Sequence, residues 1–151
     1  MIKIIAVGKL KEEYLKEAVK EYEKRLSKYT KLEIIEVNDS KIDEEKKALE
    51  EEKIEILKHI TGKEYIITLE INGKELSSVE FAKKIDETLI INSDITFIIG
   101  GSYGMHEDIR NKSNYSLSFS KMTFPHQLFR VFLLEQIFRS FKILNNEKYH
   151  K

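Results

Sequence analysis

Two short segments in the second half of the chain combine residue types suited to holding a small molecule. The first, Gly100–Gly104 (GGSYG), directly follows the apolar run Asp94–Ile99. Paired glycines at the end of a strand let a ligand approach the backbone without a Cβ in the way. The segment has neither the spacing of a dinucleotide-binding glycine motif nor a phosphate-loop lysine. Its pattern therefore indicates either a cofactor-binding loop or a tight turn.

The second segment is Ser118–Gln127 (SFSKMTFPHQ), in which small polar residues alternate with Phe119, Met122 and Phe124. Three large apolar side chains in one short loop indicate that something covers them. Such a loop offers backbone amides together with apolar contacts, a combination that suits an adenine ring and a thioether. Burial by the rest of the domain is the other interpretation.

Charged and titratable side chains are concentrated at the end of the chain. Arg130 and Arg139 interrupt an otherwise apolar helix, and Glu135 precedes Arg139 by the four residues that favour an ion pair. A guanidinium also suits phosphate binding. The segment Tyr149–Lys151 (YHK) offers a stacking ring, a group that titrates near neutrality and a cation in consecutive positions. A frayed terminus would leave the same residues without a function.

The composition excludes several kinds of chemistry. The 151 residues include no cysteine, so disulfides, thiolate zinc sites and a thiolate nucleophile are excluded. The four histidines show no ligand spacing, and we expect no metal. A formal net charge of zero argues against a purely electrostatic nucleic-acid binder. Residues 105–151 nevertheless carry 8 Lys and Arg against 4 Asp and Glu, which favours a polyanion near the C-terminal third.

Hydropathy indicates no membrane segment. No stretch approaches the roughly 18 consecutive apolar residues of a membrane span. The N-terminal apolar run is too short for the core of a signal peptide. We therefore expect a cytoplasmic protein without a membrane partner.

Strand and helix patterns alternate along the chain. Strands are predicted over residues 1–7, 32–37, 65–71, 94–99 and 115–119, the third of them closed by the Asn72-Gly73 turn signal. Helices are predicted over 11–29, 43–59, 77 or 78 to about 89, 105–112 and about 125–144. Strands separated by helices pair in parallel through right-handed crossovers. The prediction is one α/β domain spanning residues 1–151.

Ligands of open α/β sheets bind outside the carboxyl ends of the strands. Three such ends are suggestive here: Leu69-Glu70, Gly100–Gly104 and Phe119–Pro125. The last helix is apolar around nearly its whole circumference, so more than one of its sides must be covered. A homodimer partner would cover the second side, and another helix of the same chain is the alternative.

Read in order, these motifs resemble the RlmH family of SPOUT methyltransferases, which act on N3 of a pseudouridine in bacterial large-subunit ribosomal RNA. The resemblance rests on GGSYG, SFSKMTFPHQ, the helix RVFLLEQIFR and the terminal YHK. The opening IIAVGKLKEEYLKEAVKEYEKRL is also similar to the N-terminus of that family. The resemblance therefore covers the whole chain, and its specificity comes from the ordered combination of motifs.

The resemblance implies a SPOUT-type layered α/β fold with a parallel sheet and a C-terminal trefoil knot. It implies S-adenosylmethionine as the methyl donor, an obligate homodimer, and pseudouridine 1915 in helix 69 of 23S ribosomal RNA as the target on assembled ribosomes. Three loops would hold the cofactor. Their implied contact residues are Leu69, Gly100, Gly101, Phe119, Ser120, Lys121, Met122, Thr123 and Phe124.

Arg139, Tyr149 and His150 match positions that the family associates with substrate and catalysis at the dimer interface. We hypothesise that His150 accepts the N3 proton while Tyr149 orients or stacks on the base, and that Arg139 and Lys121 contact RNA phosphates. Lys151 stands where many relatives have arginine, which keeps the charge but loses a bidentate phosphate contact.

Two other functions are compatible with parts of the sequence. A non-catalytic ribosome-assembly or RNA-binding factor would bind RNA without needing S-adenosylmethionine. A flavodoxin-like or Rossmann-type cofactor domain would need a phosphate-binding glycine loop after the first strand, and Val7-Gly8-Lys9-Leu10 does not supply one.

Overall fold

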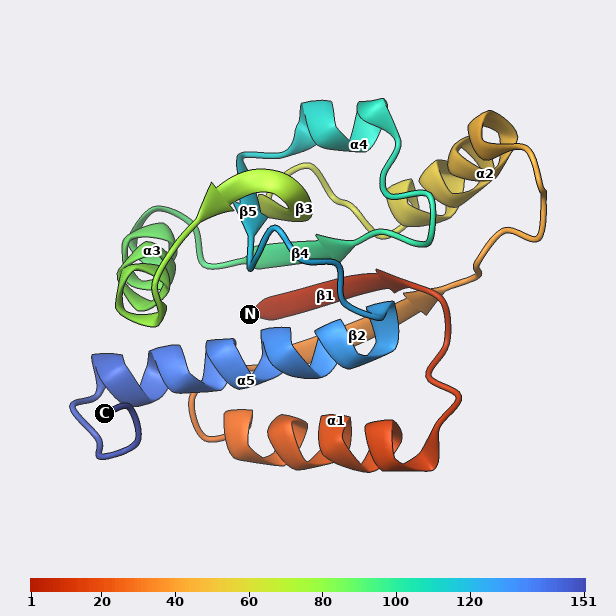
Figure 1. Cartoon of the computed structure of the whole chain (residues 1–151). Helices are drawn as coiled ribbons and strands as arrows, with labels where there is room; N and C mark the ends of the chain where they lie inside the picture. Colours follow the sequence, from red (N-terminus) through yellow and green to blue (C-terminus); the bar gives the residue numbers. More distant parts are fainter.

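The computed structural model describes all 151 residues, and strands alternate with helices along the whole chain (Figure 1). The elements are β1 (Ile2–Val7), α1 (Glu13–Leu26), β2 (Leu32–Val37), α2 (Glu45–Leu57), β3 (Tyr65–Glu75), α3 (Ser78–Ile91), β4 (Ile95–Ile99), α4 (Glu107–Lys112), β5 (Tyr115–Ser118) and α5 (His126–Leu144). Each predicted strand and helix is present, with bounds that differ by a few residues. No helix combines the length and the apolar character that crossing a membrane requires.

The five strands form one parallel sheet in the order β2-β1-β4-β3-β5, which confirms the predicted α/β class. The central strands β1 and β4 are apolar and almost fully buried, as expected of strands covered by helices on both faces. The edge strand β2 is only partly buried. Because all the strands run in one direction, the loops that follow them gather at one edge of the sheet.

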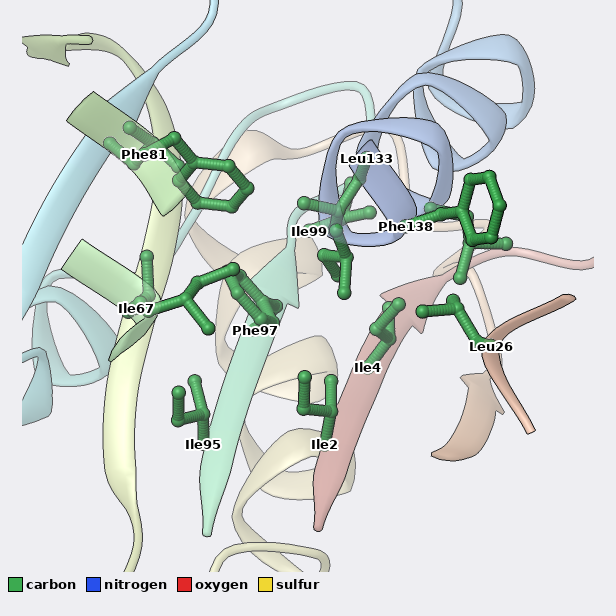
Figure 2. Packing of buried hydrophobic residues seen from close by; sticks show 14 of the residues in the cluster. Ile2, Ile4, Leu26, Ile67, Phe81, Ile95, Phe97, Ile99, Leu133 and Phe138 are labelled. Atoms are coloured by element: carbon green, nitrogen blue, oxygen red, sulfur yellow. The ribbon is translucent and has the colours of Figure 1, made fainter. Parts of the chain in front are cut away.

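Helices cover both faces of the sheet (Figure 1). The larger core lies between the sheet and α1, α3 and α5. Figure 2 shows Phe97 and Ile99 of β4 and Ile4 of β1 beneath Leu133 and Phe138 of α5. The smaller core lies on the other face, where Ile98 of β4 packs in one cluster with Ile56 of α2 and Ile109 of α4. The structure is therefore a three-layer sandwich of helices, sheet and helices.

Strand β3 continues beyond its predicted end. The Asn72-Gly73 pair was expected to close the strand, yet β3 runs on to Glu75. Leu117 of β5 is the register partner of both Leu69 and Lys74, so the residues between them bulge over β5. A Cβ on Gly73 would come within 2.7 Å of the Leu117 backbone. The glycine therefore allows two backbones to approach closely and does not end the strand.

Helix α5 is covered by other helices of the same chain. It packs against α1 and α3, and Leu133, Leu134, Ile137 and Phe138 are buried beneath them and the sheet. The in-chain alternative is thus confirmed for most of the apolar surface of α5. Phe132, with 37% of its surface exposed, marks the part that the chain leaves uncovered. The trefoil knot and the homodimer stay predictions.

An ion pair between a buried arginine and a partly exposed glutamate fixes the N-terminal half of α5. Arg130 is 2% exposed, pairs with the Glu36 carboxylate of β2, and donates to the Gly8 carbonyl oxygen at 3.0 Å. Burial raises the pKa of the Glu36 carboxyl, but hydrogen bonds from the Leu10 N–H and Arg130 outweigh it and hold the pKa below its ordinary value. The phosphate-binding interpretation is therefore wrong for Arg130, which joins α5 to the sheet.

Candidate active site

A cavity of about 650 Å³ opens at the carboxyl ends of β3, β4 and β5, within the usual size range of small-molecule sites. The three loops singled out in the sequence converge there. They contribute Leu69–Asn72 after the regular part of β3, Gly100–Met105 after β4, and Leu117–Phe124 at the end of β5, apart from Lys121. Phe129 and His126 add the first turn of α5.

The glycine loop turns back on itself beside the cavity. The Gly104 N–H donates to the Gly101 carbonyl oxygen at 3.0 Å, and Gly104 has φ of 84°. A Cβ on Gly100 would overlap the Gly104 carbonyl, and one on Gly101 would lie 3.0 Å from Val7 Cγ1. The turn therefore requires a glycine at position 100, and the tight packing against Val7 favours one at position 101. The same turn leaves the backbone of Gly100–Gly104 along the cavity wall.

Aromatic side chains build the opposite wall. The Phe119 ring lies 4.9 Å from the Phe129 ring, and the Phe124 ring lies 6.2 Å from Phe129 in a nearly parallel arrangement. Phe81 of α3 supports Phe119 from the core side, at 6.3 Å between ring centroids. Phe119 and Phe129 also pack against the large core. These rings form an apolar surface that is anchored in the fold and also faces the cavity.

An acidic and a basic side chain meet at the cavity, and the sequence analysis missed the basic one. Glu70 Oε1 lies 2.9 Å from Arg110 Nε. Glu70 Oε2 accepts hydrogen bonds from the hydroxyls of Thr68, at 2.8 Å, and Ser116, at 2.6 Å. The signal for Glu70 was its place directly after Leu69. No spacing could pair Glu70 of β3 with Arg110, which lies 40 positions further along the chain in α4.

A second carboxyl group lies behind the glycine loop. Glu52 of α2 is 3% exposed, and its Oε2 accepts from the Ser40 N–H at 3.0 Å, whereas its Oε1 has no partner. Burial raises the pKa of Glu52, and the nearby Asp39 adds to the effect, which brings the value to about 7 despite the opposing Ser40 bond. A Cβ on Gly101 would lie 3.3 Å from Glu52 Oε1. Side chains of β1 and α2 thus brace the back of the loop.

The cavity contains eight of the nine predicted cofactor-binding residues. Lining it are Leu69, Gly100, Gly101, Phe119, Ser120, Met122, Thr123 and Phe124. Lys121 is exposed and does not line the cavity. Its exposed cation fits the other role considered for it, contact with an RNA phosphate.

Arg139, Tyr149 and His150 form a separate cluster at the other end of α5. Arg139 pairs with Glu135 through Nε at 2.7 Å and through Nη2 at 2.7 Å, and its Nη1 lies 3.2 Å from His150 Nδ1. The Arg139 guanidinium also lies over the Tyr149 ring at 4.7 Å. Tyr149 in turn packs edge-on against Phe138, at 5.0 Å between ring centroids. The three predicted catalytic residues are therefore in mutual contact.

The segment that carries Tyr149 and His150 is held against the fold. Asn146 takes φ of 55° after the end of α5, which turns the chain back. Glu147 then accepts from the Tyr29 hydroxyl at 2.7 Å and pairs with Lys142 at 2.9 Å. The frayed-end interpretation is thus wrong, because side chains from α5 and from the end of α1 fix this segment.

The cavity and the Arg139 cluster lie at opposite ends of one helix. Phe129 lines the cavity, and Arg139 comes ten residues later, which is about 15 Å along a helix axis. The cluster belongs to no part of the cavity wall. Within one chain, the structure gathers the predicted residues into two groups and does not join them.

The chain matches known proteins over nearly its whole length. The family model described as "Predicted SPOUT methyltransferase" matches residues 1–150. A protein of Methanococcus maripaludis named "Putative ribosomal RNA large subunit methyltransferase H" is 57% identical, with 99% of both chains covered. "Ribosomal RNA large subunit methyltransferase H" of Clostridium tetani is 53% identical, again with 99% of both chains covered.

A solved structure supports the fold. It is described as a probable methylase family protein from Haemophilus influenzae Rd KW20, and it superposes with a TM-score of 0.60 over 99% of this chain and 70% of that chain. At 16% identity this likeness concerns the fold alone. The family match and the relatives decide the identity: this chain belongs to the SPOUT methyltransferase family, together with the proteins named ribosomal RNA large subunit methyltransferase H.

Proposed function

We propose that this protein transfers a methyl group from S-adenosylmethionine to N3 of a pseudouridine in large-subunit ribosomal RNA. The implied target is pseudouridine 1915 of helix 69 on assembled ribosomes, and the protein would act in the cytoplasm as one SPOUT domain of 151 residues. The observation that carries the proposal is the cavity at the ends of β3, β4 and β5, whose three loops hold eight of the residues that the family resemblance assigns to the cofactor.

The residues that line the cavity fit S-adenosylmethionine. Phe119, Phe124 and Phe129 offer apolar surface to a planar base, and the backbone of Gly100–Gly104 offers polar groups beside it. When bound, the cofactor supplies a methyl group that its positive sulfur makes electrophilic. No metal is needed for such a transfer, and no group of three or more potential metal ligands exists in the chain.

His150 is the proposed proton acceptor for N3, and its present hydrogen bond limits when it can act. An arginine side chain only donates hydrogen bonds, so the contact from Arg139 Nη1 makes His150 Nδ1 the acceptor. A neutral ring in this arrangement carries its proton on Nε2. His150 can therefore accept a proton at Nδ1 only after Arg139 Nη1 has moved away.

An RNA phosphate would provide the reason for that movement. Glu135 holds the Nε and Nη2 side of Arg139 in place, so Nη1 is free to turn to a different acceptor. A phosphate that takes the Nη1 donor would release His150 Nδ1 at the moment when the substrate arrives. Tyr149, held between Phe138 and Arg139, presents an aromatic ring for the target base.

A complete site on this scheme requires two copies of the chain. His150 and the cavity lie at opposite ends of α5, whereas the two reacting groups must come within about 3–3.5 Å of each other. A homodimer in which the Arg139 cluster of one copy faces the cavity of the other would join them. The partly exposed Phe132 and its neighbour Phe124, 5.5 Å apart between ring centroids, offer apolar surface for such an interface.

The test is methyl transfer from labelled S-adenosylmethionine to purified ribosomes, with the modified nucleoside identified by mass spectrometry. We expect N3-methylpseudouridine in the large-subunit RNA. Binding of the cofactor without incorporation at that site would assign the enzyme a different RNA target. Failure to bind the cofactor would overturn the proposal and favour the non-catalytic assembly factor.

A further inference from the structure

We propose that Arg110, held in place by Glu70, binds the α-carboxylate of S-adenosylmethionine. The inference rests on the proposed function and adds a specificity-determining residue to the cavity. Neither Arg110 nor its pairing with Glu70 could be found from spacing in the sequence, because α4 and β3 come together only in the folded chain.

The orientation of Arg110 leaves donors available to a ligand. Its Nε lies against Glu70 Oε1 at 2.9 Å, and its two Nη groups make no hydrogen bond within the chain. One of them, Nη2, would lie 3.9 Å from a Cβ placed on Gly104. The unused side of the guanidinium therefore faces the glycine loop, where the cavity wall is backbone.

Glu70 fixes the position of this guanidinium. Its carboxylate is itself held by the hydroxyls of Thr68 and Ser116, and Thr68 Oγ1 is also hydrogen-bonded to Ser113 Oγ at 2.8 Å. These residues belong to β3, β5 and the end of α4. Because rigid elements hold Glu70, little conformational entropy is lost when Arg110 binds an anion.

The charge distribution of the cavity singles out Arg110. Among the residues that line it, Glu70 is the only carboxylate and Arg110 is the only lysine or arginine. S-adenosylmethionine has one anionic group, the α-carboxylate, and a planar guanidinium matches a carboxylate through two parallel N–H donors. Glu70 neutralises the cation in the free protein, so the cavity need not hold an isolated charge.

An RNA phosphate has related chemistry and could bind the same donors. The position of Arg110 favours the cofactor, because its half-exposed side chain lines the cavity and its Nη2 lies near Gly104, which lines the same cavity. Arg139 and Lys121, by contrast, lie outside that wall. The experiment must therefore separate a carboxylate of the cofactor from a phosphate of the RNA.

The test compares S-adenosylmethionine with decarboxylated S-adenosylmethionine, which differ only in the carboxylate. Calorimetric titration gives the affinity of both for the unchanged protein and for Arg110→Gln. We expect Arg110→Gln to weaken S-adenosylmethionine roughly tenfold, the effect of one charge-assisted hydrogen bond, and to leave the decarboxylated ligand unchanged. Lys112→Gln is the control, since it removes a positive charge from the same helix outside the cavity.

The remaining outcomes decide against the proposal in distinguishable ways. Equal weakening of both ligands would mean that Arg110 shapes the cavity without recognising the carboxylate. Unchanged affinities together with weaker ribosome binding would assign Arg110 to an RNA phosphate. If the unchanged protein bound neither ligand, the proposed function would fail and this inference with it.

A second variant, Glu70→Gln, keeps the side-chain shape. It should weaken the binding of S-adenosylmethionine selectively, although less than Arg110→Gln does.

Discussion

Helix α5 begins beside a cavity and ends beside a cluster of charged side chains. At its N-terminal end, backbone and aromatic rings from three loops enclose about 650 Å³, and Arg130 ties the helix to the sheet. At its C-terminal end, Arg139 and His150 lie in contact at the surface with no comparable enclosure. The first end has the shape of a small-molecule site and the second has the chemistry for acting on a large anionic substrate.

On the proposed scheme, this difference makes the two ends depend on each other. Apart from Arg110, the charged or titratable side chains that line the cavity are Glu70, His126 and the phenol of Tyr103. Glu70 is already paired with Arg110. The cluster lies outside the wall of this cavity. Because about 15 Å of helix separates them, the proposed homodimer is the arrangement that would let both act on one substrate.

The largest effect is expected from the C-terminal end. His150→Ala should lower the rate of methyl transfer about a hundredfold, the scale of general base catalysis. The affinity for S-adenosylmethionine should stay unchanged, since His150 does not line the cavity. Single-turnover kinetics on ribosomes and calorimetry measure the two quantities. Lys148→Ala is the control in the same segment, and full turnover by His150→Ala with normal binding would remove His150 from the mechanism.

The next largest effect concerns Arg130, the buried arginine of α5, and the loss of its partner. Glu36→Gln leaves the buried Arg130 without its counter-ion, which should lower the free energy of unfolding by about 2–3 kcal/mol and the Tm by roughly 5–10 °C. The exposed Glu33 of the same strand provides the control Glu33→Gln. Thermal unfolding measures both variants. Equal Tm values for the two would show that the Arg130 pair does not anchor the helix.

The smallest effect concerns Glu52, behind the glycine loop at the cavity end. Its pKa rises from an ordinary 4.5 to about 7 in the folded protein, so the folded state binds this proton more tightly than the unfolded chain. The resulting stability is fully present below about pH 4.5 and is lost as the pH rises through about 7, at most about 3 kcal/mol in all.

Glu52→Gln keeps a neutral side chain at every pH and should flatten this dependence. The measurement is the Tm between pH 5 and pH 8, compared with that of the control Glu45→Gln, which alters an exposed carboxylate at the start of the same helix. If Glu52→Gln followed the same pH profile as the control, the buried carboxyl would not be the group that titrates.

Local patterns were sufficient to predict the order of elements and the three loops. An apolar run such as Ile95–Ile99 is by itself sufficient to predict a buried strand. Helix α3 begins with a capping box of Ser77 and Glu80, where the sequence predicts a serine cap. Pairings across the chain could not be predicted. Glu52 lies in a strongly charged helix that was read as mostly exposed, and only the packing of α2 on the sheet buries it.

The Asn72-Gly73 pair illustrates the same limit. Its local signal is that of a turn, yet the contact that decides its conformation is with Leu117, far along the chain. Likewise, the motifs predicted which residues matter at the two ends of α5. Only the folded structure shows that one chain holds these ends apart.

The most direct test of the account mixes two inactive variants. His150→Ala retains the cavity, and Ser102→Trp fills the cavity while it retains the Arg139 cluster. If each site takes its cavity from one copy and His150 from the other, re-equilibrated mixtures should regain about a quarter of the unchanged activity, since half of the dimers would be mixed and each would have one working site. No recovery, with mixed dimers demonstrated by mass spectrometry, would contradict a site shared between two chains.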